Sequence, residues 1–170
     1  MSEQPDPITE LYAKFDALGI AHKTYEHAPV FTVEEAAHLY ESQPGGHTKN
    51  LFLKDRKDGL WLVVCRDDLA VDLKELSNVL GSPRFSFGSG DLLVETLGVQ
   101  PGSVTPFAII NDKANKVRVV LDEGMFTLDV LNFHPLRNDR TTAIAANDLP
   151  KFLRACGHEP RIAKIPERNA

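Results

Sequence analysis

The stretch that decides the fold is Gly45-Gly46-His47-Thr48-Lys49-Asn50-Leu51-Phe52-Leu53-Lys54-Asp55. It contains an apolar run at residues 51–53, within a strand-like segment that reaches Lys54. A second apolar run, residues 60–66, follows after a turn-rich break at residues 55–59. Two strand-like runs around such a break predict a β-hairpin. The glycines ahead of the first run allow close approach of the backbone to a ligand, and a strand fixes the direction of the side chains that follow.

Helices and further strands are expected along the rest of the chain. Apolar residues at helical spacing, with capping residues and closing glycines, predict helices near residues 7–18, 32–40, 73–80, 90–97 and 148–156. Shorter apolar or alternating runs at residues 21–26, 85–87, 117–121, 131–134 and 142–145 favour strands. Irregular alternation of helices and strands favours an α/β (α+β) fold with one mixed β-sheet and helices around it.

The length and composition indicate one globular domain. We expect residues 1–170 to form it, with a core at about 8–165, and the polar tail from Pro160 to fray. No apolar run approaches the roughly 20 residues that a membrane helix needs, and the N-terminus does not resemble a signal peptide. Two distant cysteines fit a reducing cytoplasm. The net charge of −5 argues against broad nucleic-acid binding, although it allows a local basic patch.

Several classes of chemistry have no signature here. The six histidines show no His-x-x-x-His spacing and there is no Cys-x-x-Cys, so neither a metal nor another cofactor is expected. The loop before Lys49 fails the phosphate-binding pattern Gly-x-x-x-x-Gly-Lys-Ser/Thr, because Thr48 precedes the lysine and Asn50 follows it. There is no Gly-x-Ser-x-Gly turn and no recognisable cysteine nucleophile.

Three stretches could carry a function, and each also has an ordinary explanation. Lys49 could bind a phosphate or a carbonyl oxygen, or be a solvated lysine. The loop at residues 102–106, Gly-x-x-x-Pro, could present backbone N–H groups to an oxyanion, or be a plain turn. His134, within Asn132-Phe133-His134-Pro135-Leu136-Arg137-Asn138-Asp139, is restricted by the following proline to extended backbone. It could be catalytic or structural.

Taken together and in this order, these stretches resemble the YbaK/ProRS-associated editing-domain family over about residues 8–165. Within the family the chain is most similar to the free-standing ProX branch. In YbaK proper a threonine typically follows the loop lysine. Here Asn50 follows it, and the whole stretch from Asn132 to Asp139 is present. The resemblance implies the YbaK/ProRS-associated domain fold and a trans-editing deacylase that hydrolyses the ester of mischarged Ala-tRNA(Pro).

The resemblance also implies roles for individual residues. Lys49 would bind and orient the terminal adenosine's phosphate or the ester region. Gly102 and Ser103 would supply backbone N–H donors to the substrate. His134 would line the amino-acid pocket, and Asn50 would be the polar partner of the group bound there. Further substrate contacts are expected from Val104, Thr105, Pro106 and Phe133. The absence of a triad agrees with catalysis by positioning, since an aminoacyl ester is already activated.

The implied partners are the acceptor end of tRNA(Pro) and, transiently, prolyl-tRNA synthetase. Lys54 and Arg84 are candidate contacts to the acceptor stem, whereas Arg56 and Lys57 are better explained as solvated surface charge. Two alternatives remain open: a YbaK-like Cys-tRNA(Pro) deacylase, and a tRNA-binding module of the same fold without catalytic activity.

Overall fold

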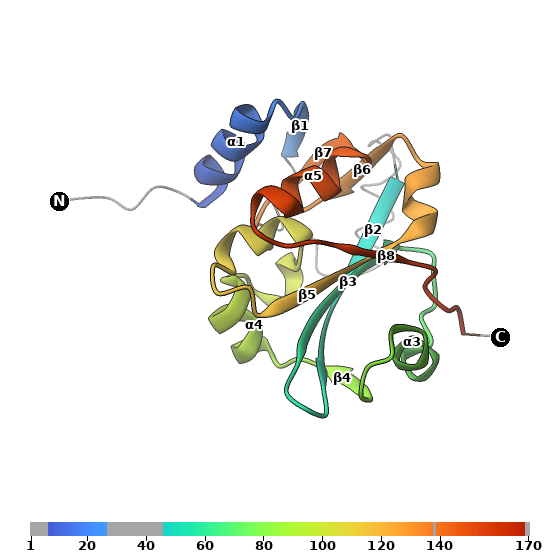
Figure 1. Ribbon diagram of the computed structural model, residues 1–170. Coiled ribbons are helices and arrows are strands. Elements are labelled where there is room, and N and C mark those ends of the chain that lie inside the picture. The colour runs from blue at the N-terminus through green and yellow to red at the C-terminus, as the bar shows by residue number, and fades with distance from the viewer. Residues whose placement is uncertain (1–6, 27–45, 138, 169–170) are drawn as a thin grey trace.

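The fold is one mixed β-sheet with helices on both faces, seen in a computed structural model that describes residues 7–26, 46–137 and 139–168 (Figure 1). The strand order is β1-β7-β6-β2-β3-β5-β8, with β4 paired to β2 beside this path. The strands are β1 (His22–Glu26), β2 (Gly46–Asp55), β3 (Leu60–Arg66), β4 (Phe85–Phe87), β5 (Val117–Asp122), β6 (Val130–Phe133), β7 (Arg140–Ala145) and β8 (Arg161–Ala163). The expected mixed sheet is therefore confirmed.

The predicted hairpin forms the centre of this sheet. β2 and β3 pair antiparallel from Thr48 opposite Arg66 to Lys54 opposite Leu60. Because side chains alternate along a strand, Phe52 and Leu53 enter different hydrophobic cores on the two faces of the sheet. The helices that cover these faces are α1 (Pro7–Leu18), α4 (Gly90–Leu97) and α5 (Asp148–Ala155) on the Phe52 side, and α3 (Leu73–Leu80) on the Leu53 side.

The helix ends follow from local sequence. The Asp72 carboxylate accepts a hydrogen bond from Glu75 N at 3.1 Å, which caps α3. Ser89 Oγ accepts one from Leu92 N at 3.1 Å, which caps α4. Gly81 and Gly98 close the same two helices at φ of +67° and +70°, a conformation that costs glycine little. The expected helix at residues 32–40 lies outside the described residues.

The structure corrects two expectations at the ends of elements. Residues 46–48 were expected in a loop, but β2 already begins at Gly46, because residues 46 and 47 pair with β6. The tail was expected to fray, yet β8 pairs parallel with β5, and Ile165 is buried. Two side chains anchor the approach to β8: His158 Nε2 lies 2.8 Å from Asp112 Oδ2, and Arg161 donates to Leu80 O at 2.9 Å. These contacts join residues that are far apart in the sequence, so no local sequence pattern predicts them.

Three short segments of the described chain form 3₁₀ turns: η1 (Pro101–Ser103), η2 (Pro106–Asn111) and η3 (Glu123–Thr127). In η2, Phe107 packs edge-on against Phe133 of β6, with ring centroids 5.2 Å apart. Among the described helices, none is long and apolar enough to cross a membrane.

The hairpin turn depends on one buried carboxylate. Asp55 accepts hydrogen bonds from Lys57 N at 2.8 Å, Gly59 N at 2.9 Å and the Trp61 indole N–H at 3.0 Å. Burial raises the pKa of Asp55, but these donors and the charge of Arg118 outweigh it, so the pKa lies below its usual value. The ionised form is therefore the one that the fold stabilises.

We predict that Asp55→Asn lowers the free energy of unfolding by about 1–3 kcal/mol at pH 7, because an amide cannot accept from all three donors. Since the folded-state pKa is depressed, the stabilisation by Asp55 is present above the ordinary carboxyl pKa and is lost as the pH falls through the folded-state value. Urea unfolding of both proteins at pH 7 and near pH 3 measures this. A stability difference that does not shrink in acid would contradict it.

Candidate functional site

The candidate site lies where the central strand β2 has an incomplete neighbour. β3 pairs along one edge of β2. The other edge pairs with β6 at residues 46–47 and with β4 at residues 53–55. Between these two pairings, no strand in the described part of the chain adjoins residues 48–52. β2 and β6 are parallel and diverge after their short pairing, so they form a fork.

The backbone groups of Asn50 point toward this open edge. The backbone N–H and C=O groups of the odd-numbered residues of β2 point toward β3 and the segments next to it. Asp67 N donates to His47 O at 3.0 Å, and Asp55 N donates to Gly59 O at 2.9 Å. The backbone carbonyl of Phe52 points to the other edge of β2, since it accepts a hydrogen bond from Gly88 N at 2.9 Å. Backbone polar groups alternate between the two edges of an antiparallel strand. Asn50 N–H and C=O are therefore directed into the fork.

Polar contacts hold the base of the fork. Thr48 Oγ1 donates to Asn132 O at 3.0 Å, and Asn132 Nδ2 donates to Gly46 O at 3.1 Å. Gly46 has little room for a side chain, because an added Cβ would lie 2.3 Å from Leu128 Cδ1. These contacts keep β2 and β6 together at one end, so that the fork opens at a defined position.

A cavity of about 30 Å³ occupies the fork. It is lined by His47, Thr48, Asn50, Asn132, Phe133, His134 and Thr141. Among the described residues, no Asp, Glu, Lys or Arg lines this cavity. The side-chain oxygen of Asn50 is buried and has no hydrogen-bond partner among the described residues. A buried acceptor without a partner is rare in proteins.

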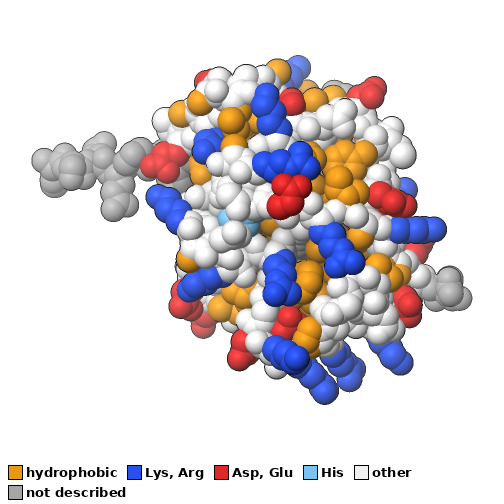
Figure 2. All heavy atoms as spheres, in the orientation of Figure 1, with side chains coloured by type: hydrophobic (Ala, Val, Ile, Leu, Met, Phe, Trp, Pro, Cys, Tyr) orange, Lys and Arg blue, Asp and Glu red, His pale blue; other side chains and the backbone are white. Residues whose placement is uncertain are grey.

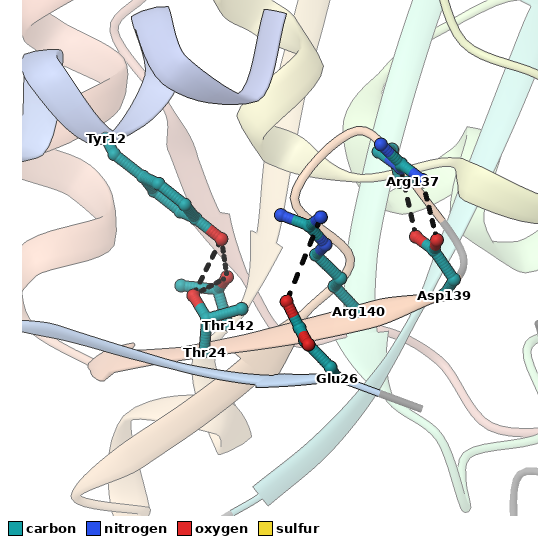
Figure 3. Close-up of polar contacts among 7 residues, drawn as sticks. All are labelled: Tyr12, Thr24, Glu26, Arg137, Asp139, Arg140 and Thr142. Atoms are coloured by element: carbon teal, nitrogen blue, oxygen red, sulfur yellow. Dashed lines mark hydrogen bonds and ion pairs between the residues drawn. The ribbon is translucent and has the colours of Figure 1, made fainter. Parts of the chain in front are cut away.

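The loop after β6 holds His134 in place. His134 Nδ1 donates to Arg140 O at 2.9 Å, so in the neutral ring the lone pair is on Nε2. Arg137 forms a bidentate pair with Asp139, at 3.0 and 2.7 Å, and its hydrogen bonds lower the pKa of that carboxyl (Figure 3). Leu136 has φ of +71°, an uncommon conformation for a leucine. The turn is thus fixed by contacts at each end.

The neighbouring sheet face is tied to α1 by hydroxyl groups. Tyr12 Oη lies 2.7 Å from Thr24 Oγ1 and 3.3 Å from Thr142 Oγ1, and the two threonines are 2.9 Å apart across β1 and β7 (Figure 3). Arg140, on the same strand as Thr142, lies 3.9 Å from Glu26. These contacts hold β7, and with it the Arg140 carbonyl that orients His134.

Lys49 lies on the opposite face of β2 from the Asn50 side chain. It is paired in register with Cys65 of β3. Burial raises the pKa of the Cys65 thiol to about 12, and the nearby charge of Lys49 acts to lower it. Lys49 is absent from the cavity lining, so the structure brings together Asn50, Phe133 and His134 but separates them from the predicted lysine.

The loop at residues 102–106 supports the site without lining this cavity. Ser103 is buried and its N–H donates to Gln100 O at 2.8 Å, within η1, which also contains Gly102. Thr105 Oγ1 accepts from Phe107 N at 3.3 Å and so caps η2. Val104 and Pro106 pack in the core on this side. Through Phe107 the loop braces Phe133, which is a wall of the cavity.

The two predicted tRNA contacts lie near each other at the far end of β2. Lys54 is opposite Ser86 in register, and Arg84 directly precedes β4. The Lys54 ammonium is 3.2 Å from Asp58, and Arg84 is exposed. Basic side chains gather at this end of the face shown in Figure 2, over the β2–β3 hairpin and β4.

Four cavity residues were missed in the sequence. His47, Thr48, Asn132 and Thr141 line the cavity beside Asn50 and His134. Period-two spacing could have found Thr48 from Asn50 and Asn132 from His134, once both segments were taken as strands. A larger hollow of about 750 Å³ lies between β1, β6 and β7. We place the candidate site at the smaller cavity, because the buried acceptor and three of the predicted residues, Asn50, Phe133 and His134, are there. Among the described residues, no group of three or more His, Cys, Asp and Glu side chains could hold a metal ion.

Comparisons with known proteins give a consistent result. The family model described as "Aminoacyl-tRNA editing domain" matches residues 27–152. The chain is 37% identical over 154 residues to the prolyl-tRNA editing protein ProX of Acetoanaerobium sticklandii, covering 90% of this chain and 94% of that protein. It is 40% identical over 157 residues to prolyl-tRNA synthetase associated domain-containing protein 1 of Danio rerio, covering 90% and 84%.

Solved structures show the same fold. One, described as a candidate trans-editing enzyme for prolyl-tRNA synthetase, superposes with a TM-score of 0.73 at 18% identity, covering 98% of this chain and all of that one. Another, of a hypothetical protein, gives a TM-score of 0.75 at 19% identity and covers 94% of this chain. At this level of identity the likeness concerns the fold.

We predict that Gly88→Ala destabilises the protein by about 1–3 kcal/mol, because an added Cβ would lie 2.4 Å from the buried Phe52 ring. The Phe52 ring would then have to move, and Phe52 lies on β2, the strand that also carries Asn50. Chemical unfolding measures the loss, with Ser86→Ala on the same edge strand as control. Equal stability of both variants would show that the ring accommodates the methyl group.

Proposed function

Because the chain belongs to the aminoacyl-tRNA editing domain family, we propose that it is a trans-editing deacylase that hydrolyses the ester of mischarged Ala-tRNA(Pro). The observation that carries the proposal is the cavity in the fork of β2 and β6, where Asn50, Phe133 and His134 meet. Its size and neutral lining suit one small polar group of an aminoacyl ester. The similarity of the chain to a protein named for prolyl-tRNA editing supports the choice of tRNA(Pro).

The proposed reaction needs positioning more than a strong nucleophile. Water attacks the ester carbonyl carbon, a new C–O bond forms, the bond to the ribose oxygen breaks, and that oxygen takes up a proton. An aminoacyl ester is already activated, so orientation of the ester and stabilisation of the oxyanion supply most of the rate. Asn50 and His134 would hold the aminoacyl group, and a backbone N–H at Gly102 would face the carbonyl oxygen. Ser103 N–H already bonds Gln100 O, so we give it no direct role.

Lys49 fits this proposal from the other side of β2. The aminoacyl group would lie on the Asn50 side and the adjoining phosphate on the Lys49 side, so the 3′ end of the tRNA would cross the open edge of the strand. A flexible single strand can do so, since no neighbouring strand in the described chain blocks residues 48–52. In this arrangement one strand segment, paired with β3 on one edge and open on the other, serves both contacts.

Two other functions use the same fold. A Cys-tRNA(Pro) deacylase would share the cavity and differ in the amino acid that it accepts. A tRNA-binding module without catalytic activity would keep the basic end at Lys54 and Arg84 and lack turnover. Asn50 after the lysine favours the alanine ester over the cysteine ester. The presence of Lys49, Gly102 and His134 argues against a module without catalytic activity.

We predict that the protein deacylates Ala-tRNA(Pro) and spares Pro-tRNA(Pro). Asn50→Ala and Lys49→Ala should each lower the rate at least about tenfold, since each removes a positioning contact to the reacting group. Lys113→Ala, which removes an exposed lysine distant in sequence from the site, is the matched control and should keep full activity. Turnover of the cysteine ester alone would favour the first alternative. Binding without turnover would favour the second.

We predict that Lys54 and Arg84 each contact phosphate. Replacing either by alanine should weaken tRNA binding and reduce the slope of log K against log salt by about one. Lys57→Ala, on the exposed hairpin turn, should leave the slope unchanged. Binding measured across a salt series tests both expectations. An unaltered slope in the Lys54 and Arg84 variants would remove these residues from the interface.

A further inference from the structure

The last residue of β4, Phe87, exposes an aromatic ring that the fold does not use. Its side chain is 64% exposed, more than any other large hydrophobic residue in the described part of the chain. Phe85, two positions earlier on the same strand, is buried and packs edge-on against Trp61, with ring centroids 5.4 Å apart. A single exposed apolar side chain is not unusual by itself. What matters is where this ring lies.

The Phe87 ring shares a face of the sheet with Lys49. Phe87 is opposite Leu53 in the register of β4 and β2, and residues paired in this way place their side chains on the same face. Lys49 is an even number of positions before Leu53, so its side chain lies on that face too. Leu51, between them, packs against the core under this face. At the rise of a strand, Lys49 and Leu53 are about 13 Å apart along β2.

The ring also stands at the margin of the open edge of β2. β4 ends at Phe87, and Gly88 N then donates to Phe52 O at 2.9 Å. Beyond this hydrogen bond lie residues 48–52, which no strand of the described chain adjoins. Ser89 caps α4 directly afterwards. The backbone under the ring is therefore held by strand pairing on one side and by a helix start on the other, so a ligand that binds the ring has little backbone to order.

We propose that Phe87 is a stacking platform for an unpaired base at the 3′ end of the tRNA, on the same face of β2 as the phosphate that Lys49 binds. This inference rests on the proposed deacylase function and deepens it. Proteins hold single-stranded nucleic acids by combining basic side chains with aromatic rings, because each nucleotide carries a phosphate and each base has a π-face. A 3′ end that crosses the open edge at residues 48–52 would meet both groups on this face.

The surroundings of the ring suit a nucleic acid better than a protein partner. Arg84, Ser86 and Ser89 are exposed beside it, and Phe87 is the one exposed apolar side chain within residues 84–89. Protein-docking surfaces are contiguous apolar patches. A lone ring among a cation and hydroxyl groups can bury its face against a base while the neighbouring charge remains available to a phosphate.

The test compares the binding of two uncharged RNAs at low salt: full-length tRNA(Pro), and the same tRNA without its unpaired 3′ nucleotides. We expect Phe87→Ala to weaken the binding of full-length tRNA(Pro) by about 5- to 150-fold, which corresponds to the loss of one stacked base. The same variant should bind the truncated tRNA as the wild type does. An equal loss for both RNAs would place Phe87 against another part of the tRNA and overturn the inference, as would no loss for either.

Further variants separate stacking from an ordinary apolar contact. Phe87→Tyr keeps the aromatic ring and should keep the affinity, whereas Phe87→Leu keeps apolar bulk without a π-face and should bind as weakly as Phe87→Ala. Full affinity of the leucine variant would overturn the inference. Val94→Ala shortens another exposed hydrophobic residue, on α4, and is the matched control that should leave binding unchanged. Thermal unfolding verifies that each variant is folded.

Kinetics separate this inference from the proposed function. Phe87 does not line the cavity in the fork, and a stacked base is held equally before and during the reaction. Phe87→Ala should therefore raise the KM for the alanine ester and leave kcat unchanged. A fall in kcat with an unchanged KM would contradict the inference. Failure of the wild type to hydrolyse the alanine ester would instead overturn the proposed deacylase function, and the binding results for Phe87 would still stand.

Discussion

The structure depends on how the hydrogen-bonding edges of β2 are shared. One edge is fully paired with β3, and the other is divided between β6 at its start and β4 at its end. A strand normally satisfies its backbone through neighbours on both sides. Here the division leaves a short central segment facing a cavity, with Asn50 in its middle. The site is thus a property of the sheet topology before it is a property of any side chain.

The same division separates residues that are adjacent in sequence. Lys49 and Asn50 were both assigned to one site, but in a strand neighbouring side chains point to opposite faces. The structure pairs Lys49 with Cys65 and Asn50 with the cavity. A substrate that contacts both must pass over the strand edge between them. The strand direction, and not only the motif, therefore constrains how a ligand can lie.

Local features of the fold could be read from sequence, and distant pairings could not. The hairpin, the Asp72 and Ser89 caps and the closing Gly81 each depend on residues within a few positions of one another. The fork depends on Thr48 meeting Asn132, which are 84 positions apart, and β8 depends on pairing with β5. Phe133 and His134 were recognised from their motif and Thr48 and Asn132 could have been found from period-two spacing, whereas Thr141 had no signal until the strands were placed side by side. The loop at residues 102–106 was expected to contribute to the site; it does not line the small cavity, and the adjoining Phe107 packs against the cavity residue Phe133.

The divided edge of β2 also bears on self-association. An exposed strand edge can recruit a strand from another molecule, and proteins commonly keep such edges short or covered. In the described chain, the uncovered part of β2 is bounded by β6 on one side and by β4 with Gly88 on the other. A foreign strand would find too few consecutive backbone groups to form a ladder. The protein can thus leave backbone donors and acceptors open to a small ligand while offering a poor template for aggregation.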